Sequence, residues 1–156
     1  MIPPAKADSL LIIVPALNEE GAIAGVVREI QQHVPGVPIV VIDDSSSDNT
    51  IEIARKAGAH VLPMPHHLGL GGCVQAGYKL AYELGFNYVI RVDGDGQHDA
   101  RDIPRILERL KSSGCEMVIG SRFVADSGSR TGAVRSLGIW FFRMILRPIS
   151  RASFTR

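Results

Sequence analysis

Short runs of consecutive apolar residues alternate along this chain with segments whose apolar residues recur every three or four positions. Uninterrupted runs rich in β-branched residues are typical of strands buried on both faces, and the longer recurrence is typical of amphipathic helices. The expected strands are residues 10–14, ending at Pro15, and residues 39–42, 60–62, 88–92 and 117–119. This alternation predicts an α/β fold with a mostly parallel, Rossmann-like sheet and helices on both faces.

Polar capping residues and glycines mark where the helices should begin and end. Asn18 is expected to cap the first helix, and Asp48 the second. Ligands of parallel sheets bind beyond the carboxyl ends of the strands, so functional residues are expected in the loops that follow them. Those loops are residues 15–20, 43–50, 63–72, 93–99 and 120–132, and the later helices are expected at 73–84 and 103–110, closed by Gly85 and Gly114.

The sequence DGDGQ directly follows the fourth expected strand and contains Asp93 and Asp95. Two carboxylates this close repel each other unless a cation lies between them. Oxygen-only donors, here both aspartates and the Gln97 amide, suit Mg²⁺ or Mn²⁺. An acidic glycine-rich turn without a metal is the alternative, and the position at a strand end favours the metal site.

Acidic residues also follow the first two strands. Asp43 and Asp44 end the second strand, where carboxylates can accept hydrogen bonds from a nucleobase or a ribose, whereas capping alone explains Asp48. After the first strand, Glu19 or Glu20 could reach a ribose hydroxyl or simply favour the helix N-terminus. The local sequence leaves these two interpretations open.

The loop of residues 65–72 is similar to a phosphate cradle at a helix start, although it lacks the Gly-Lys-Ser/Thr of a Walker loop. Its adjacent His66 and His67 are not expected to share a metal, and its glycines should allow tight packing beside a cleft. After the fifth expected strand come Arg122, Arg130 and Arg135, which are either phosphate ligands or ordinary surface arginines.

Composition limits the class of protein. The 156 residues fit one domain, expected at 1–133 with a tail at 134–156, and 46% hydrophobic residues exclude a disordered chain. A net charge of +1 does not indicate a nucleic-acid partner. The two cysteines lack CxxC spacing and are compatible with a reducing compartment. The apolar run at 10–17 is too short to span a membrane, and no signal peptide is expected.

Five stretches together resemble the family 2 glycosyltransferases with the GT-A fold, and most closely the dolichol-phosphate mannose synthases and their bacterial polyprenyl-phosphate relatives. The resemblance covers roughly residues 10–135, and its specificity comes from the order and spacing of the stretches. They are LIIVPALNEE, VVIDDSSSDNT, HHLGLGGCVQAGYKLA, VIRVDGDGQHD and VIGSRFV.

The resemblance implies a metal-dependent transfer of a hexose from a nucleotide-diphosphate sugar, such as GDP-mannose or a UDP-sugar, to a polyprenyl or dolichyl phosphate. It implies a nucleoside pocket formed by one set of residues and a metal and phosphate site formed by another. The nucleoside would be contacted by Pro15, Leu17, Glu19 and Asp44, and the nucleotide diphosphate by Asp93 and Gly94. The Mg²⁺ or Mn²⁺ ion would be bound by Asp93, Asp95 and Gln97. Catalysis would depend on Asp95, Arg122 and Arg135. Leu17 stands where many members have a tyrosine.

The C-terminal part of the chain differs from the family pattern. Members usually continue with a segment that adds an inner strand, so the chain is expected to be truncated, to bind its donor and to transfer sugar poorly. Its unpaired edge could favour a homo-oligomer. Residues 134–151 combine arginines with apolar residues at helical spacing, a pattern typical of a helix at a membrane surface or packed on its own core. We therefore expect a cytoplasmic protein or a peripheral one at the cytoplasmic membrane face.

There are two alternatives to the glycosyltransferase hypothesis. A sugar-nucleotide pyrophosphorylase also combines a parallel sheet with Mg²⁺, but it would need a glycine-rich basic loop after the first strand, and PALNEE has neither feature. A nucleotide-sugar-binding fragment without turnover is the second. Titration with UDP- and GDP-sugars, with and without Mn²⁺, separates these possibilities.

Overall fold

The computed structural model describes residues 2, 9–97 and 99–120. Residues 1–118 form one compact unit, and residues 119–156 form a second, of which only 119 and 120 are described. The described sheet has four strands in the order β3-β2-β1-β4, and every neighbouring pair is parallel. The strands are β1 (Leu10–Ala16), β2 (Ile39–Asp43), β3 (His60–Pro63) and β4 (Tyr88–Arg91).

Helices connect the strands, because parallel neighbours need a crossover instead of a tight turn. The connecting helices are α1 (Ile23–His33), α2 (Thr50–Lys56) and α3 (Gly69–Glu83), and β4 leads into the short 3₁₀ helix η1 (Ala100–Asp102) and α4 (Ile103–Ser113). The α/β prediction with a parallel sheet is confirmed. Within the described ranges, no helix has both the length and the apolar character needed to cross a membrane.

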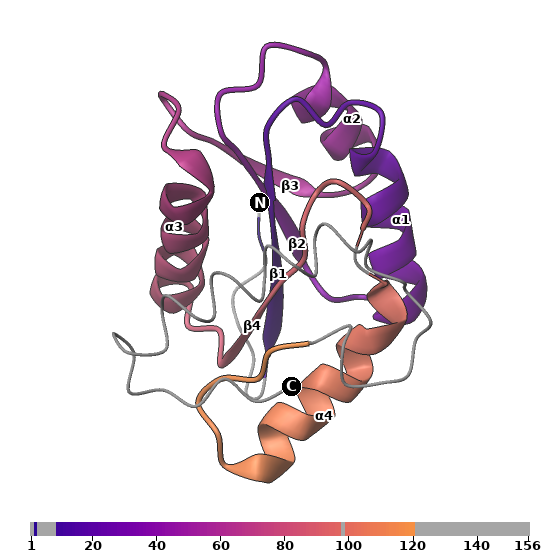
Figure 1. The fold of residues 1–156 in the computed structure, drawn as a ribbon, viewed down its shortest axis with the longest axis vertical. Coiled ribbons are helices and arrows are strands. Elements are labelled where there is room, and N and C mark those ends of the chain that lie inside the picture. The colour runs from indigo at the N-terminus through magenta and orange to yellow at the C-terminus, as the bar shows by residue number, and fades with distance from the viewer. Residues whose placement is uncertain (1, 3–8, 98, 121–156) are drawn as a thin grey trace, which may run out of the picture. The chain divides into compact units, whose positions relative to one another are not determined.

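Both faces of the sheet are covered, as Figure 1 shows for α3 on one side and α1 on the other. Alternate residues of β1 point to opposite faces, so Ile12 and Val14 belong to one core cluster while Leu11 and Ile13 belong to a second. The first cluster includes side chains of α1, α2 and α4, and the second includes Cys73 and Ala81 of α3. Burial on both faces explains the continuous apolar strands.

The prediction that Pro15 ends the first strand is wrong, because β1 continues to Ala16 and Pro15 pairs in register with Ile42. The Ile12 N–H donates to Pro38 on the β2 side, so the nitrogen of Pro15, three residues on, faces the β4 side. There β4 has already ended at Arg91, opposite Ile13. The missing N–H of the proline therefore costs no bond between strands.

The predicted helix starts need correction. Asn18 does not cap α1, whose N-cap residue is Ala22, because its side chain accepts hydrogen bonds from Ser47 in the neighbouring loop. The N-cap residue of α2 is Asn49, although the Asp48 carboxylate does accept the Thr50 N–H, the first of that helix. The third helix begins at residue 69, four residues before the predicted start, and the αL glycine at 114 closes α4 as predicted.

Residues 117–119 do not form the predicted fifth strand and have no regular secondary structure. A strand needs a neighbour for its backbone groups, and within the described residues β4 pairs with β1 alone. The prediction of a buried strand from this apolar run is therefore wrong, and Met117 is 69% exposed. The predicted phosphate ligands Arg122, Arg130 and Arg135, and the amphipathic stretch at 134–151, lie outside the described residues.

Candidate functional site

The carboxyl ends of all four strands meet at one edge of the sheet, and backbone contacts tie their loops together. Asp44 N–H donates to the Ala16 carbonyl at 2.9 Å, and Met64 N–H donates to the Asp43 carbonyl at 2.8 Å. Gly94 lies so close to β1 that a Cβ there would be 3.1 Å from the Pro15 carbonyl oxygen. The loops predicted to carry the site after β1, β2 and β4 are thus brought side by side.

Reciprocal hydrogen bonds hold the loop after β1 against the loop after β2. Ser47 N–H donates to Asn18 Oδ1 at 2.8 Å, Glu19 N–H to Thr50 Oγ1 at 2.8 Å, and Asn49 N–H to Glu20 Oε2 at 3.1 Å. This assigns the Glu20 carboxylate to the support of the loop. The Glu19 carboxylate accepts no hydrogen bond within the described residues, so of the two glutamates it is the one available to a ligand.

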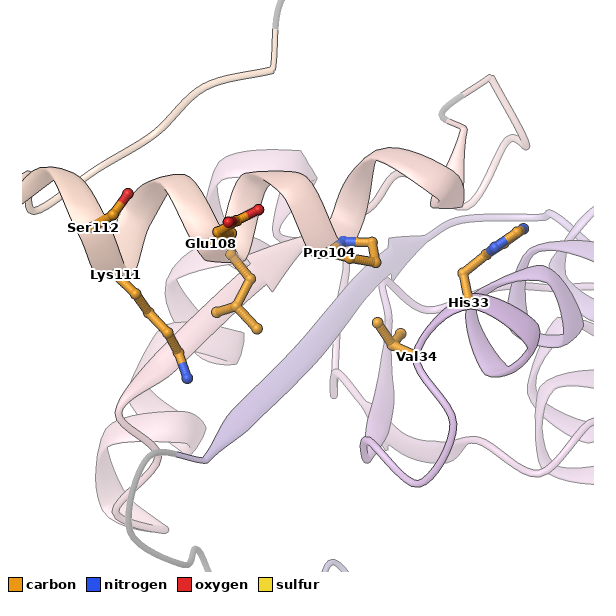
Figure 2. Close-up of a pocket in the computed structure, with 7 residues that line it drawn as sticks. His33, Val34, Pro104, Glu108, Lys111 and Ser112 are labelled. Atoms are coloured by element: carbon orange, nitrogen blue, oxygen red, sulfur yellow. The ribbon is translucent and has the colours of Figure 1, made fainter.

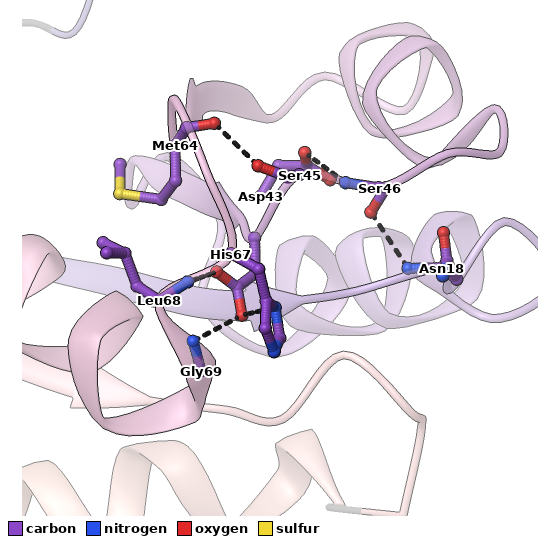
Figure 3. A network of polar contacts seen from close by, with 9 residues as sticks. Asn18, Asp43, Ser45, Ser46, Met64, His67, Leu68 and Gly69 are labelled. Carbon is purple, nitrogen blue, oxygen red and sulfur yellow. Dashed lines mark hydrogen bonds and ion pairs between the residues drawn. The ribbon is translucent and has the colours of Figure 1, made fainter.

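Asp44 is buried and its carboxylate faces the start of α3. Oδ1 accepts the Leu68 N–H at 2.6 Å, and Oδ2 accepts the Gly69 N–H at 2.9 Å and lies 2.8 Å from His67 Nδ1. Figure 3 shows these three partners around one carboxylate. Asp44 therefore satisfies backbone donors that a helix start leaves without partners, a role independent of any nucleoside contact.

The pKa of Asp44 reflects these contacts. Burial alone would raise it, but hydrogen bonds from Leu68, the Cys73 thiol and Gly69, together with the charge of His67, bring it below the ordinary value of 3.8. Burial and the hydrogen bond to Asp44 raise the pKa of the Cys73 thiol to about 12. Cys73 is thus an inert buried thiol.

Asp43 supports the turn that follows β2. Its Oδ2 accepts the Ser46 N–H at 3.0 Å, while Oδ1 is buried without a hydrogen-bond partner in the described part of the chain. Ser45 adopts φ 65° in the same turn, and its hydroxyl donates to the Met64 carbonyl. The two adjacent aspartates therefore differ: Asp44 holds the start of α3, and Asp43 shapes its own loop.

The predicted metal ligands lie in the loop after β4. Asp93 is half-buried and forms an ion pair with Arg91, whose Nε is 3.1 Å from Oδ1 and whose Nη2 is 3.4 Å from Oδ2. Asp95 and Gln97 are exposed, and the Asp95 Oδ1 accepts the Gln97 N–H at 2.9 Å. Gly94 between the aspartates is buried against β1. Gly94 thus anchors the loop against β1, and the carboxylates of Asp93 and Asp95 stand on either side of it in the chain.

These residues fit a hard divalent cation in their chemistry. The available donors are carboxylate and amide oxygens, and Mg²⁺ is commonly held by one or two carboxylates plus substrate phosphates. No group of three or more His, Cys, Asp or Glu side chains could hold a metal ion among the residues described.

The sequence reasoning missed His67 as a partner of Asp44 and Arg91 as a partner of Asp93. His67 gave no local signal, because its contact joins loops 23 residues apart in the chain. Arg91 lies only two residues before Asp93, at the end of β4, so its proximity in the chain was a local signal for the contact.

A shallow hollow of about 530 Å³ lies away from this site, between the end of α1 and the face of α4. Figure 2 shows His33 and Val34 opposite Pro104, Glu108 and Lys111. Since β2 begins soon after α1 ends, this hollow lies towards the amino edge of the sheet. Ligands of parallel sheets bind at the opposite edge, so the hollow is not the candidate site.

The sequence of this chain is similar to that of known glycosyltransferases. The family model described as "Glycosyl transferase family 2" matches residues 11–154. The chain is 32% identical to the UDP-N-acetylglucosamine–dolichyl-phosphate N-acetylglucosaminyltransferase of Methanococcus voltae, covering 90% of this chain and 64% of that protein. It is 32% identical to the undecaprenyl-phosphate mannosyltransferase of Micrococcus luteus, covering 74% and 49%. It is 29% identical to the polyprenol monophosphomannose synthase of Mycolicibacterium smegmatis, covering 94% and 54%.

Solved structures give the same fold. The glucosyl-3-phosphoglycerate synthase of Mycobacterium tuberculosis, in complex with Mn²⁺, UDP-glucose and phosphoglyceric acid, matches with a TM-score of 0.57 and 25% identity, covering 67% of this chain and 40% of that one. The same enzyme has also been solved with Mg²⁺ and UDP. The chain spans about half to two-thirds of the length of the relatives named above.

Proposed function

Because this chain belongs to glycosyl transferase family 2, we propose that it binds a nucleotide-diphosphate sugar with a divalent cation and serves the transfer of the hexose to a polyprenyl phosphate. The donor would be GDP-mannose or a UDP-sugar. Relatives named for transfer to dolichyl, undecaprenyl and polyprenol phosphates support this acceptor. A structural relative solved with Mn²⁺ and UDP-glucose supports the cation and the class of donor.

The observation that carries the proposal is the contact of the Asp93–Asp95 loop with the end of β1. Gly94 approaches the Pro15 carbonyl so closely that the loop after β4 and the loop after β1 share one edge. A ligand that spans both loops needs a part recognised by Pro15, Leu17 and Glu19 and an anionic part near the two aspartates. A nucleoside joined to a diphosphate has this form.

Each residue then has a proposed task. Leu17, which is 41% exposed, offers an apolar surface to the base, and Glu19 accepts from a ribose hydroxyl. Asp44 combines a nucleoside contact with its support of α3. Asp93, Asp95 and Gln97 provide oxygens for Mg²⁺ or Mn²⁺, and the arginines at 122 and 135 contribute positive charge for the phosphates.

The proposed sugar transfer requires little proton transfer by these residues. A polyprenyl phosphate is already anionic at neutral pH, so it needs positioning more than a strong general base. A bound divalent cation would offset the charge that develops on the leaving diphosphate. The loops of the chain would orient the donor towards the acceptor. Orientation of two reactants can lower the activation free energy by roughly 7–11 kcal/mol.

Calorimetric titration of the chain with GDP and UDP, each with and without Mn²⁺, tests the donor site. One nucleotide should bind only with the metal, and Asp95→Asn should remove the metal-dependent part because it deletes a charged ligand. Asp102→Asn is a matched control, since that exposed carboxylate caps no helix N–H. Equal nucleotide affinity in excess EDTA would sink the proposal.

Transfer itself needs a separate measurement, because a chain that binds the donor without turnover would pass the titration. We would incubate the chain with the matching radiolabelled nucleotide sugar, Mn²⁺ and a short polyprenyl phosphate, and extract the lipid. Labelled lipid that disappears with Asp95→Asn supports the transferase. Binding without any labelled lipid supports the nucleotide-sugar-binding fragment.

A further inference from the structure

Arg91 is the last residue of β4 and contacts Asp93 through one edge of its guanidinium, formed by Nε and Nη2. Nη2 donates a hydrogen bond to Oδ2 at 3.4 Å, and Nε lies at an ion-pair distance of 3.1 Å from Oδ1, so the guanidinium is close to both carboxylate oxygens. The two side chains are 37% and 29% exposed. Asp95, the other predicted metal ligand, instead accepts the Gln97 N–H. The positive charge of Arg91 is thus placed beside Asp93.

A guanidinium and a divalent cation compete for such a carboxylate. Both seek the same oxygen lone pairs, and they repel each other over the short distance between them. A cation that takes Asp93 must either displace the Arg91 guanidinium or accept a positive neighbour at its ligand. Each outcome lowers the affinity of Asp93 for the cation.

We propose that Arg91 is a positioning residue that keeps the metal affinity of Asp93 low until an anionic diphosphate is present. The diphosphate adds negative charge beside the cation, and it also gives the displaced guanidinium an anionic partner. Arg91 thereby couples metal binding to nucleotide binding, and by linkage the coupling acts equally in both directions. This inference rests on the proposed function.

The test measures Mn²⁺ affinity directly, from the electron paramagnetic resonance signal of free Mn²⁺, with and without saturating nucleoside diphosphate. Arg91→Gln should bind Mn²⁺ roughly two- to fivefold more tightly without nucleotide, the range expected for one partly exposed ion pair. The gain in Mn²⁺ affinity on adding nucleotide should shrink. Arg91→Lys keeps the charge and should restore most of that gain.

Arg101→Gln is the matched control. Arg101 forms an ion pair with Asp99, with Nη2 2.6 Å from Oδ2, so this variant removes the positive charge of another arginine–aspartate pair without touching Asp93. An equal effect of Arg101→Gln, or unchanged or weaker Mn²⁺ binding in Arg91→Gln, would overturn the role of Arg91. If the wild-type chain bound no Mn²⁺ even with nucleotide, the proposed metal use would fail as well. Thermal unfolding of each variant verifies its fold.

Discussion

At the scale of single residues, one buried carboxylate, that of Asp44, contacts several partners from different parts of the chain. Asp44 accepts two consecutive backbone N–H groups at the start of α3 and contacts His67 and the Cys73 thiol. A group so placed links the end of β2 to the helix that covers one face of the sheet. Its substitution should therefore affect folding as well as any contact with a nucleoside.

We predict that Asp44→Asn lowers the free energy of unfolding at neutral pH by about 1–3 kcal/mol, because a buried acceptor of two N–H groups is lost or rearranged. Urea unfolding followed by circular dichroism measures it. Glu52→Gln is the control, since its pair with Lys56 is 3.7 Å long and exposed, and it should change stability by less than about 0.5 kcal/mol. An equally small change in Asp44→Asn would contradict the supporting role.

The stability difference between wild type and Asp44→Asn should depend on pH. Because the folded-state pKa of Asp44 is lowered from 3.8, its charge contributes stability above that value, and this contribution is lost as the pH falls through the folded-state pKa. The stability difference between wild type and Asp44→Asn should therefore narrow below about pH 4.

At the scale of elements, the packing of α3 on β1 depends on the absence of a side chain at Gly77. A Cβ there would lie 2.8 Å from Cδ1 and 3.2 Å from Cγ2 of the fully buried Ile13. The same helix contains Gly71, where a Cβ would meet nothing within 4 Å. One helix thus offers two glycines with opposite packing requirements.

Gly77→Ala should destabilise the protein by about 1–3 kcal/mol through overpacking. Gly71→Ala should be neutral or stabilise it by up to about 1 kcal/mol, because alanine has the higher helix propensity. Chemical unfolding of both variants checks the pair. If Gly77→Ala were as well tolerated as Gly71→Ala, the close approach of α3 to β1 would be wrong.

At the scale of the whole molecule, the proposed acceptor, with its polyprenyl chain, would bring the protein to a membrane surface. The stretch at 134–151 combines Arg143 and Arg147 with Trp140 and Phe141, a composition suited to anionic lipid. Each arginine near such a surface contributes about 1 kcal/mol. Membrane association through this stretch is accordingly a proposal that the sequence alone supports.

We predict that the chain floats with vesicles of mixed anionic and neutral lipid at low salt and is released as the salt concentration rises. The double variant Arg143→Glu and Arg147→Glu should reduce flotation strongly, while vesicles of neutral lipid alone should bind weakly. The absence of flotation at low salt would favour the alternative of a helix packed on its own core.

The sequence alone determined the fold class and the sheet edge at which the candidate site is proposed. Uninterrupted apolar strands such as residues 39–42 are typical of a parallel sheet covered on both faces, and the strands of such a sheet end at one common edge. The aspartates of the DGDGQ loop could be singled out because two close carboxylates at a strand end need a counter-charge, whatever the remainder of the fold.

Only the tertiary structure decided what depends on a partner distant in the chain. Pro15 could remain in β1 because β4 ends before reaching it, and residues 117–119 are no strand because no described neighbour pairs with them. Asn18 accepts a hydrogen bond from Ser47, 29 positions away, instead of capping α1 as predicted. Asp44 accepts hydrogen bonds from the start of α3. A polar side chain bonds to whichever donor the fold brings within about 3 Å, and a local pattern contains no information about that donor.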